Sequence, residues 1–240
     1  MLNDVAFLCA PSHRSKAYLQ LMCRHEVQPS FCLIMTPDPE RLLSEEREYV
    51  DGSVEPDYFQ AEEPLLFTLK QHGIPYDFCA IDNVNDELLL PRLSLLQQHY
   101  VVYSGYGGQI LKAPVLEAGK KFIHIHSGIV PRYRGSTTVY YSLLEESNCG
   151  ASAIFFDQQI DTGPLIATKT FEIPENAPDM DYIFDPYIRA QLLSEVLMHY
   201  KEYGFFPTKE QEGAEEIYFI IHPILKHIAV LSEIEPKRGL

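Results

Sequence analysis

The sequence has few basic residues, no long apolar run and no paired cysteine motif. Its 19 Lys and Arg stand against 34 Asp and Glu, which gives a formal net charge of −15 over 240 residues. Binding to nucleic acid or to an anionic membrane depends on clustered basic side chains, so this composition argues against either partner. No run approaches the ~20 apolar residues of a membrane helix, and the N-terminus lacks the pattern of a signal peptide.

The five cysteines are dispersed, odd in number and free of Cys-x-x-Cys spacing. Two of them, Cys9 and Cys32, lie in apolar, strand-like runs. This pattern is typical of cysteines that are buried and remain reduced, and we therefore expect a cytoplasmic protein. The hydrophobic share of 46% is that of an ordinary globular chain, and the length fits one large α/β domain with or without a small appendage.

Strand-like and helix-like segments alternate along most of the chain. The expected strands are residues 5–9, 31–35, 78–81, 100–104, 122–126, 151–156 and 165–173. The expected helices are residues 15–24, 63–72, 86–97, 109–118, 136–146 and 181–203, the last with a break at Pro186. This order predicts an α/β, Rossmann-like fold: a mostly parallel twisted sheet with helices on both faces.

Two segments depart from a minimal domain of this kind. Residues 45–63 are acidic and contain Gly52 and Pro56, which favours a solvated loop; a lid or a partner-binding insertion is the alternative. The tail is apolar on both sides of Pro223, which predicts a small β extension, a hairpin that could also build a homodimer contact. We therefore place a main domain at residues 1–204 and the extension at residues 205–240.

Two histidines share one face of the strand expected at residues 122–126. In a strand, side chains i and i+2 point the same way, so His124 and His126 point together while Ile123 and Ile125 point to the opposite face. The isoleucines can be buried on one face of the sheet. The histidines then project near the carboxyl end of a strand, which is where ligands collect in open α/β sheets.

A basic turn at residues 130–135 and the motif Asp161-Thr162-Gly163 follow this strand. Together with His126 they resemble the signature of the folate-dependent formyltransferases: Asn-x-His, Leu-Pro-x-Tyr/Phe-Arg-Gly, and a downstream Asp-Thr/Ser-Gly. That family includes methionyl-tRNA, glycinamide ribonucleotide and sugar N-formyltransferases. The resemblance covers roughly residues 3–172 and includes Tyr103 to Gly107 and Ile110-Leu111. One position departs from it, because His124 replaces the family's Asn.

The resemblance implies a catalytic domain at residues 1–204 that uses 10-formyltetrahydrofolate. Transfer of a formyl group to an amine passes through an oxyanion, so the site needs a hydrogen-bond donor and a proton acceptor. By resemblance, His126 and Asp161 are catalytic, and we expect Asp161 to favour the imidazolium form of His126. Three interpretations of His124 are open: an altered oxyanion donor, different acyl chemistry, or a site that binds without turnover.

Two further groups of residues are expected to bind ligands. The resemblance assigns the folate to Tyr103, Gly105, Tyr106, Gly107, Ile160, Thr162 and Gly163. The amine substrate is expected to meet the first βα turn and the basic turn, at Ser12, Arg14, Ser15, Arg132, Tyr133 and Arg134. Helix capping is an equally good account of Ser12 and Ser15, and the two basic-turn arginines can instead pair with acids. Arg134 and Gly135 are expected to matter chiefly for loop geometry.

The predicted function is transfer of a formyl group from 10-formyltetrahydrofolate to an amine on a small, anionic molecule. An amino-sugar nucleotide is the first guess for the acceptor, since the negative charge and short tail disfavour tRNA. A formyltetrahydrofolate hydrolase and a non-catalytic folate- or metabolite-binding protein are the alternatives. His124, His126 and Asp161 could also form a three-ligand zinc centre, but the resemblance has no metal precedent, and we expect none.

Overall fold

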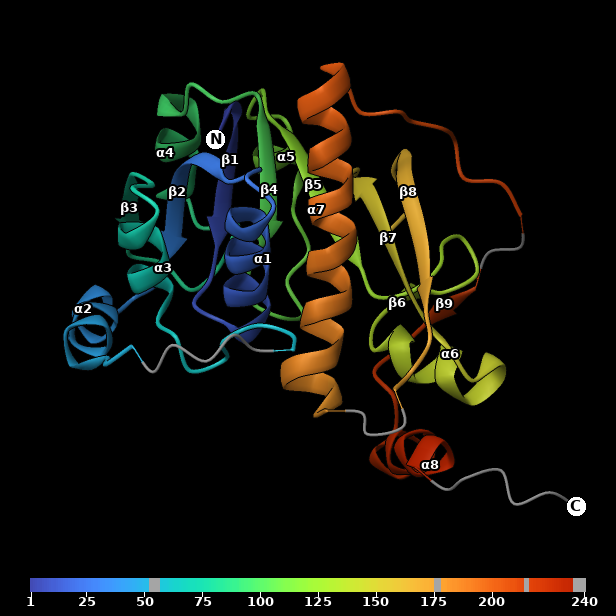
Figure 1. Ribbon diagram of the computed structural model, residues 1–240. Helices are drawn as coiled ribbons and strands as arrows, with labels where there is room; N and C mark the ends of the chain where they lie inside the picture. The colour runs from blue at the N-terminus through green and yellow to red at the C-terminus, as the bar shows by residue number, and fades with distance from the viewer. Residues whose placement is uncertain (52–56, 175–177, 214–215, 235–240) are drawn as a thin grey trace, which may run out of the picture.

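A seven-stranded sheet forms the centre of the molecule (Figure 1). The computed structural model describes residues 1–51, 57–174, 178–213 and 216–234. The sheet has the order β3-β2-β1-β4-β5-β7-β8; its pairings are parallel except for the two that involve β7. The strands are β1 (Leu2–Cys9), β2 (Pro29–Met35), β3 (Tyr76–Cys79), β4 (Tyr100–Ser104), β5 (Lys121–His126), β7 (Cys149–Phe155) and β8 (Leu165–Phe171). The predicted mostly parallel α/β sheet is confirmed.

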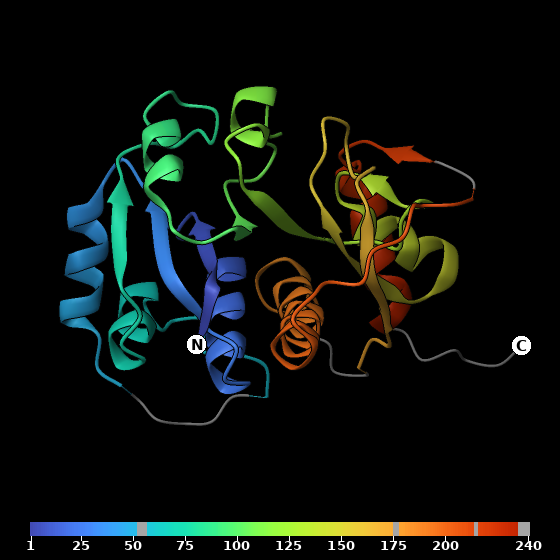
Figure 2. The ribbon, with the colours of Figure 1, turned by 90° about the horizontal axis from the view of Figure 1, so that it is seen from above.

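Helices cover both faces of this sheet (Figure 2). On one face lie α1 (His13–Arg24), α3 (Leu65–Gln71) and α7 (Asp185–Tyr203); on the other lie α4 (Leu89–Leu95) and α5 (Ala113–Leu116). Strand β1 shows why both faces are needed, because Phe7 packs into the first core and Leu8 into the second, both fully buried. Continuous apolar strands of this kind are characteristic of parallel sheets.

Helix α2 (Pro39–Glu48) was not predicted. Asp38 caps it by accepting a hydrogen bond from the Arg41 N–H at 3.1 Å, and Pro39 occupies its first turn. The proline-rich sequence that ends β2 therefore also starts a helix. The acidic segment predicted as a loop begins inside α2, and residues 52–56 of that segment lie outside the described residues.

Helix α7 is preceded by a π-helical turn at Met180–Phe184. Pro186 lies in the first turn of α7, where a missing N–H costs nothing. The break expected at Pro186 is thus a change of helix type just before it. Within the described residues no helix, α7 included, is apolar enough over a sufficient length to cross a membrane.

The hairpin predicted for the C-terminal extension is wrong. In the part of the extension that the structure describes, the β structure is an isolated bridge from Lys209 to Leu165 and a two-residue strand, β9 (Ile217–Tyr218), paired in parallel with β6 (Arg134–Gly135). Helix α8 (Pro223–Ile234) follows. Pro223 starts that helix, and Ala229 packs with α6 (Thr138–Glu146), beside which α8 lies (Figure 1). An apolar run around a proline reads equally well as two strands or as a helix with proline in its first turn. The division at residue 204 stays a prediction.

Candidate active site

His124 and His126 leave the same face of strand β5 near its carboxyl end. Ile123 and Ile125 are fully buried against α1 and α7, as the alternation predicted. His126 is only 4% exposed. The ring of His124 stacks on Phe156, with centroids 4.6 Å apart and an interplanar angle of 25°. The register of one strand therefore sets the positions of both imidazoles.

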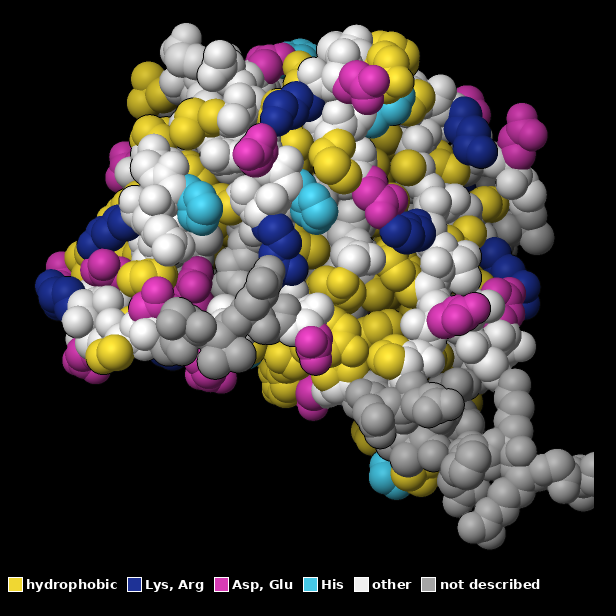
Figure 3. Space-filling model, in the orientation of Figure 1, with side chains coloured by type: hydrophobic (Ala, Val, Ile, Leu, Met, Phe, Trp, Pro, Cys, Tyr) yellow, Lys and Arg dark blue, Asp and Glu magenta, His cyan; other side chains and the backbone are white. Residues whose placement is uncertain are grey.

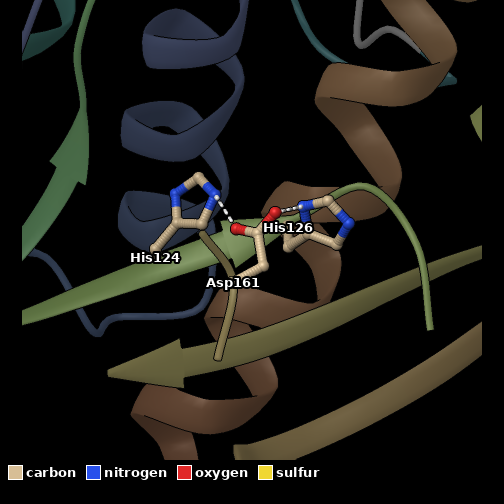
Figure 4. A group of neighbouring side chains, drawn as sticks. All are labelled: His124, His126 and Asp161. Atoms are coloured by element: carbon tan, nitrogen blue, oxygen red, sulfur yellow. Dashed lines mark ion pairs between the residues drawn. The ribbon is translucent and has the colours of Figure 1, made fainter. Parts of the chain in front are cut away.

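Asp161 lies between the two imidazole rings (Figure 4). Its Oδ2 is 3.2 Å from Nδ1 of His126, and its Oδ1 is 3.9 Å from Nε2 of His124. Asp161 has a φ of 55°, a left-handed conformation that Asp adopts more readily than most residues. A Cβ at Gly163 would lie 1.8 Å from the carbonyl oxygen of Phe155. The Asp-Thr-Gly sequence thus meets a backbone requirement that turns the acid toward β5.

The basic turn and the C-terminal segment hold the Asp161 loop in place. The Gly135 N–H donates to Oδ2 of Asp161 at 2.9 Å. Gln211 donates from Nε2 to the carbonyls of Asp161 and Gly163, at 2.9 and 2.8 Å. Arg134, which is 3% exposed, donates in turn to Oε1 of Gln211 at 2.8 and 3.2 Å. These contacts fit the expected role of Arg134 in loop geometry, and its substrate contact stays a prediction. They also show that Gln211, which the sequence did not reveal, holds the Asp161 loop.

His126 faces a hydrogen-bond acceptor on each ring nitrogen. Nε2 donates to the carbonyl oxygen of Tyr133 at 2.6 Å, while Nδ1 faces the Asp161 carboxylate. A neutral imidazole carries a single N–H, so donation from Nε2 leaves a lone pair on Nδ1 directed at Asp161. The His126–Asp161 pair therefore has a place for one additional proton.

Burial dominates the charge state of both histidines. The pKa of His126 is lowered because burial outweighs the opposing effect of the Asp161 carboxylate. The pKa of His124 is lowered well below its ordinary value, by burial first and then by the charges of His126 and Arg14. Asp161 therefore favours the imidazolium form of His126, as expected, but burial outweighs it. With its imidazole neutral and its carboxylate charged, the pair can accept a proton rather than donate one.

The first βα turn is bonded mainly to its own helix and to β4. Ser12 caps α1 by accepting from the Ser15 N–H at 3.2 Å. Ser15 is fully buried, with its Oγ 2.8 Å from Oγ of Ser104. Arg14 donates from Nε to Ser104 Oγ at 3.0 Å and from its terminal nitrogen to the Gly105 carbonyl. The capping interpretation fits Ser12, whereas Ser15 lies inside α1 and bonds to Ser104. Arg14 fixes the loop after β4, and substrate contacts at all three residues stay predictions.

The end of β4 and the loop after it carry four of the predicted folate residues. A Cβ at Gly105 would lie 2.0 Å from the hydroxyl oxygen of Tyr103, so the loop requires glycine there. Tyr106 donates from its hydroxyl to the Met35 carbonyl at 3.0 Å, and Gly107 is exposed. The Tyr103 hydroxyl is buried without a hydrogen-bond partner among the described residues. The loop is anchored on two sides, and its folate contacts stay predictions.

The other three predicted folate residues, Ile160, Thr162 and Gly163, lie in the loop after β7. Thr162 donates from its hydroxyl to the carboxylate of Asp157, at 2.7 and 2.8 Å to the two oxygens. Ile160 is 42% exposed, as several other large apolar side chains of this chain are. Thr162 thus stabilises the loop, and folate contacts at these residues stay predictions.

Arg132 and Tyr133 are occupied by acids of helix α6. Arg132 pairs with Glu146 and, at 3.0 Å, with Glu145, and its guanidinium lies 5.0 Å from the Tyr133 ring centroid. Tyr133 donates from its hydroxyl to Glu145 at 3.0 Å. Tyr133 therefore reaches His126 through its backbone carbonyl alone. Pairing with acids is the interpretation of Arg132 that the contacts favour.

An ion pair on α7 completes the surroundings of the histidines. Arg189 donates from Nε to Asp185 at 2.9 Å and pairs through a second nitrogen at 2.8 Å. Its third nitrogen lies 3.4 Å from the Ile125 carbonyl oxygen, and Ser127 donates to Asp185. Acid and base four residues apart are common on helices, so the sequence offered no signal for this pair.

The fold and the His–Asp constellation define an α/β site of the formyltransferase type. A family model described as formyl transferase matches residues 58–182, more than half of the chain. The chain therefore belongs to the formyl transferase family, as the sequence motifs predicted.

Similar proteins differ in how much of this chain they cover. Methionyl-tRNA formyltransferase from Finegoldia magna is 31% identical over 150 residues, which cover 61% of this chain and 48% of that protein. Phosphoribosylglycinamide formyltransferase from Bacillus halodurans has a TM-score of 0.56 at 18% identity, covering 84% of this chain and 96% of that one. An N-formyltransferase from Helicobacter canadensis has a TM-score of 0.54 at 14% identity, covering 91% and 71%. The chain spans about half the length of the curated relatives it matches.

Proposed function

We propose that this protein transfers the formyl group of 10-formyltetrahydrofolate to the nitrogen of an amine. The observation that carries the proposal is the His126–Asp161 pair, which is buried, joined at 3.2 Å and able to accept one proton. Membership of the formyl transferase family supports the reaction class. The Helicobacter canadensis structure was solved in complex with folinic acid, which supports a folate as the formyl donor.

His124 and His126 have different roles in the proposed acyl transfer. 10-Formyltetrahydrofolate supplies a formyl group bound to nitrogen, whose carbon the neutral amine attacks. His124, neutral through its lowered pKa, donates one N–H to the oxygen on which negative charge develops. The His126–Asp161 pair takes the proton that the attacking nitrogen loses. It returns that proton to the departing nitrogen when the bond between carbon and folate breaks, so protons balance over the cycle.

Hydrogen bonds around the pair fix its geometry for this step. The Tyr133 carbonyl fixes the tautomer of His126, and the Gly135 N–H holds Asp161 Oδ2. Both contacts come from the basic turn, so one short segment orients acid and base together. Holding the acceptor of a proton within reach of the reacting nitrogen is worth several kcal/mol of a barrier.

A small, anionic amine is the acceptor class that we propose. The net charge of −15 disfavours a polyanionic acceptor such as tRNA, and on the face drawn in Figure 3 the basic side chains lie dispersed among acidic ones. The Helicobacter canadensis structure also contains dTDP-3-aminofucose, which supports an amino-sugar nucleotide as the first candidate. The name of the Finegoldia magna relative makes methionyl-tRNA the competing acceptor.

One assay tests both the reaction and the acceptor. The protein is incubated with 10-formyltetrahydrofolate, alone and with amino-sugar nucleotides, amino acids or methionyl-tRNA, while tetrahydrofolate release and the mass of each amine are followed. A gain of one formyl group on an amino-sugar nucleotide supports the proposal, and formylation of methionyl-tRNA alone refutes the acceptor class. Release without a modified amine identifies the hydrolase, and folate binding without release identifies the binding protein. Cytoplasmic location and a homodimer stay predictions.

A further inference from the structure

His124 adds a third metal-ligand side chain to the His126–Asp161 pair (Figure 4). One ligand atom from each of the three residues lies within 4.8 Å of the other two. We propose that His124, His126 and Asp161 together bind one divalent ion of the zinc class. This inference departs from the sequence-based expectation of no metal. Metal binding itself can be measured whether or not the protein transfers formyl groups.

The distances and the donor set suit zinc. Two imidazole nitrogens and one carboxylate oxygen leave a fourth position open, as in catalytic zinc sites. Bonds of about 2.0–2.1 Å in a tetrahedron place ligand atoms about 3.3 Å apart. The two Asp161 contacts lie near that value but involve different carboxylate oxygens: Oδ2 is 3.2 Å from Nδ1 of His126 and Oδ1 is 3.9 Å from Nε2 of His124. With one donor atom per residue, the three atoms lie within 4.8 Å of one another, so the side chains must draw closer together to bind one ion.

The surrounding hydrogen bonds already orient two of the three ligands. The Tyr133 carbonyl takes the Nε2 proton of His126, so the Nδ1 lone pair points toward Asp161. A backbone carbonyl on the outer nitrogen is the arrangement that metal-binding histidines use to fix ring and tautomer. The Gly135 N–H holds the carboxylate in the same way.

Burial and local charge also bear on the site. His126 and Asp161 are 4% and 7% exposed, so the ion is shielded from bulk water. Nδ1 of His124 is buried and has no hydrogen-bond partner among the described residues, so no protein contact holds this ring in one tautomer. Of the two nearby guanidinium groups, that of Arg189 is compensated by Asp185, while Arg14 opposes a cation. Nitrogen ligands select zinc-class ions over Mg²⁺ or Ca²⁺, which prefer oxygen.

A bound ion and a transferred proton would use the same atoms. The Nδ1 lone pair of His126 and the Asp161 carboxylate form the proposed proton acceptor, and both are metal ligands here. Metal binding therefore excludes proton transfer, and zinc inhibits formyl transfer. This consequence rests on the proposed function, whereas metal binding does not.

Cobalt binding tests the site directly, with Co²⁺ as a spectroscopic probe for zinc. Wild-type protein is dialysed against Co²⁺; bound metal is counted and the visible absorption recorded, then Zn²⁺ is added. We expect one cobalt per chain, an absorption band of a low-coordinate ion, and its loss on zinc addition. His124→Asn should weaken binding by more than the roughly 10- to 100-fold cost of losing a second-shell partner. His72→Asn, which alters an exposed histidine on α3's C-terminal side, should leave binding unchanged.

Two results overturn the inference: no cobalt bound to the wild type, or equal binding by wild type and His124→Asn. Circular dichroism shows whether the variant is folded, and Asp161→Asn serves as the second ligand variant if it is not. The formyl-transfer assay runs separately with metal removed. Formyl transfer without cobalt binding refutes this inference alone, and cobalt binding without formyl transfer refutes the proposed function alone.

Discussion

The Asp161 loop and the first βα turn are both rich in polar side chains but use them differently. In the turn, Ser15 is hydrogen-bonded to Ser104, and Arg14 donates to Ser104 and to the Gly105 carbonyl. Around Asp161, the neutral His126 points a lone pair at a carboxylate and so retains capacity for a proton. Saturated polar groups stabilise a scaffold, whereas groups held together with unused capacity can do chemistry. We therefore expect the chemistry to take place on β5 and the loop after β7, and the first βα turn to give structural support.

Removing the proton acceptor should have the largest effect. We expect His126→Ala or Asp161→Ala to lower kcat for formyl transfer by roughly 10²–10⁴-fold, the usual contribution of general acid–base catalysis. Thermal unfolding should show that each variant remains folded. Asp38→Ala, which removes the cap of α2, is the matched control at a position with no predicted ligand contact. Rates near wild type in both site variants would contradict the mechanism.

The buried histidines should make stability fall in acid. Because their pKa values are lowered in the folded protein, the unfolded chain binds protons first as the pH drops below about 6.5. Stability is therefore full above that pH and is lost below it, by at most about 1.4 kcal/mol per pH unit for each histidine. Urea unfolding of the wild type and of His124→Asn, at several pH values, measures this loss. An identical pH dependence in the two proteins would show that His124 does not contribute.

Gln211 should affect catalysis only by holding the loop that carries Asp161. Its amide bonds two carbonyls of the acid's loop, so Gln211→Ala should lower kcat by about 10-fold, in keeping with a misplaced catalytic group. KM for the amine should change little, because Gln211 has no predicted substrate contact. Gln158→Ala, at an exposed position of the loop after β7, is the matched control. A rise in KM with unchanged kcat would instead indicate a binding role.

Local patterns predicted the parts of the site that depend on neighbours in the chain. The alternation of Ile123 and Ile125 with His124 and His126 needs only the two-residue period of a strand. Asp161 was found because its Asp-Thr-Gly motif resembles that of the family, and the structure shows the backbone requirement that this motif meets.

Contacts between distant segments left no such mark. Gln211 reaches a carbonyl 50 positions away, and β9 pairs with β6 over two residues each. The charge state of His126 depends on how deeply the fold buries it, and the spacing of residues in the sequence does not reveal that depth. The same limit explains the error at Pro223, where tertiary packing of α8 on α6 decided between strand and helix.

Arg132→Ala should have the smallest effect of these substitutions. It tests whether Arg132 belongs to the structural scaffold or binds the acceptor. Arg132 is about half exposed and already paired with Glu145 and Glu146, and exposed ion pairs contribute about 0–1 kcal/mol. If Arg132 belongs to the scaffold, Arg132→Ala should change kcat/KM less than twofold and lower stability only slightly. If it instead leaves its acids to hold an anionic acceptor, KM for that acceptor should rise more than tenfold and become sensitive to salt. Glu146→Gln separates the two cases, because weakening the pair should free Arg132 and lower KM only if the arginine binds substrate.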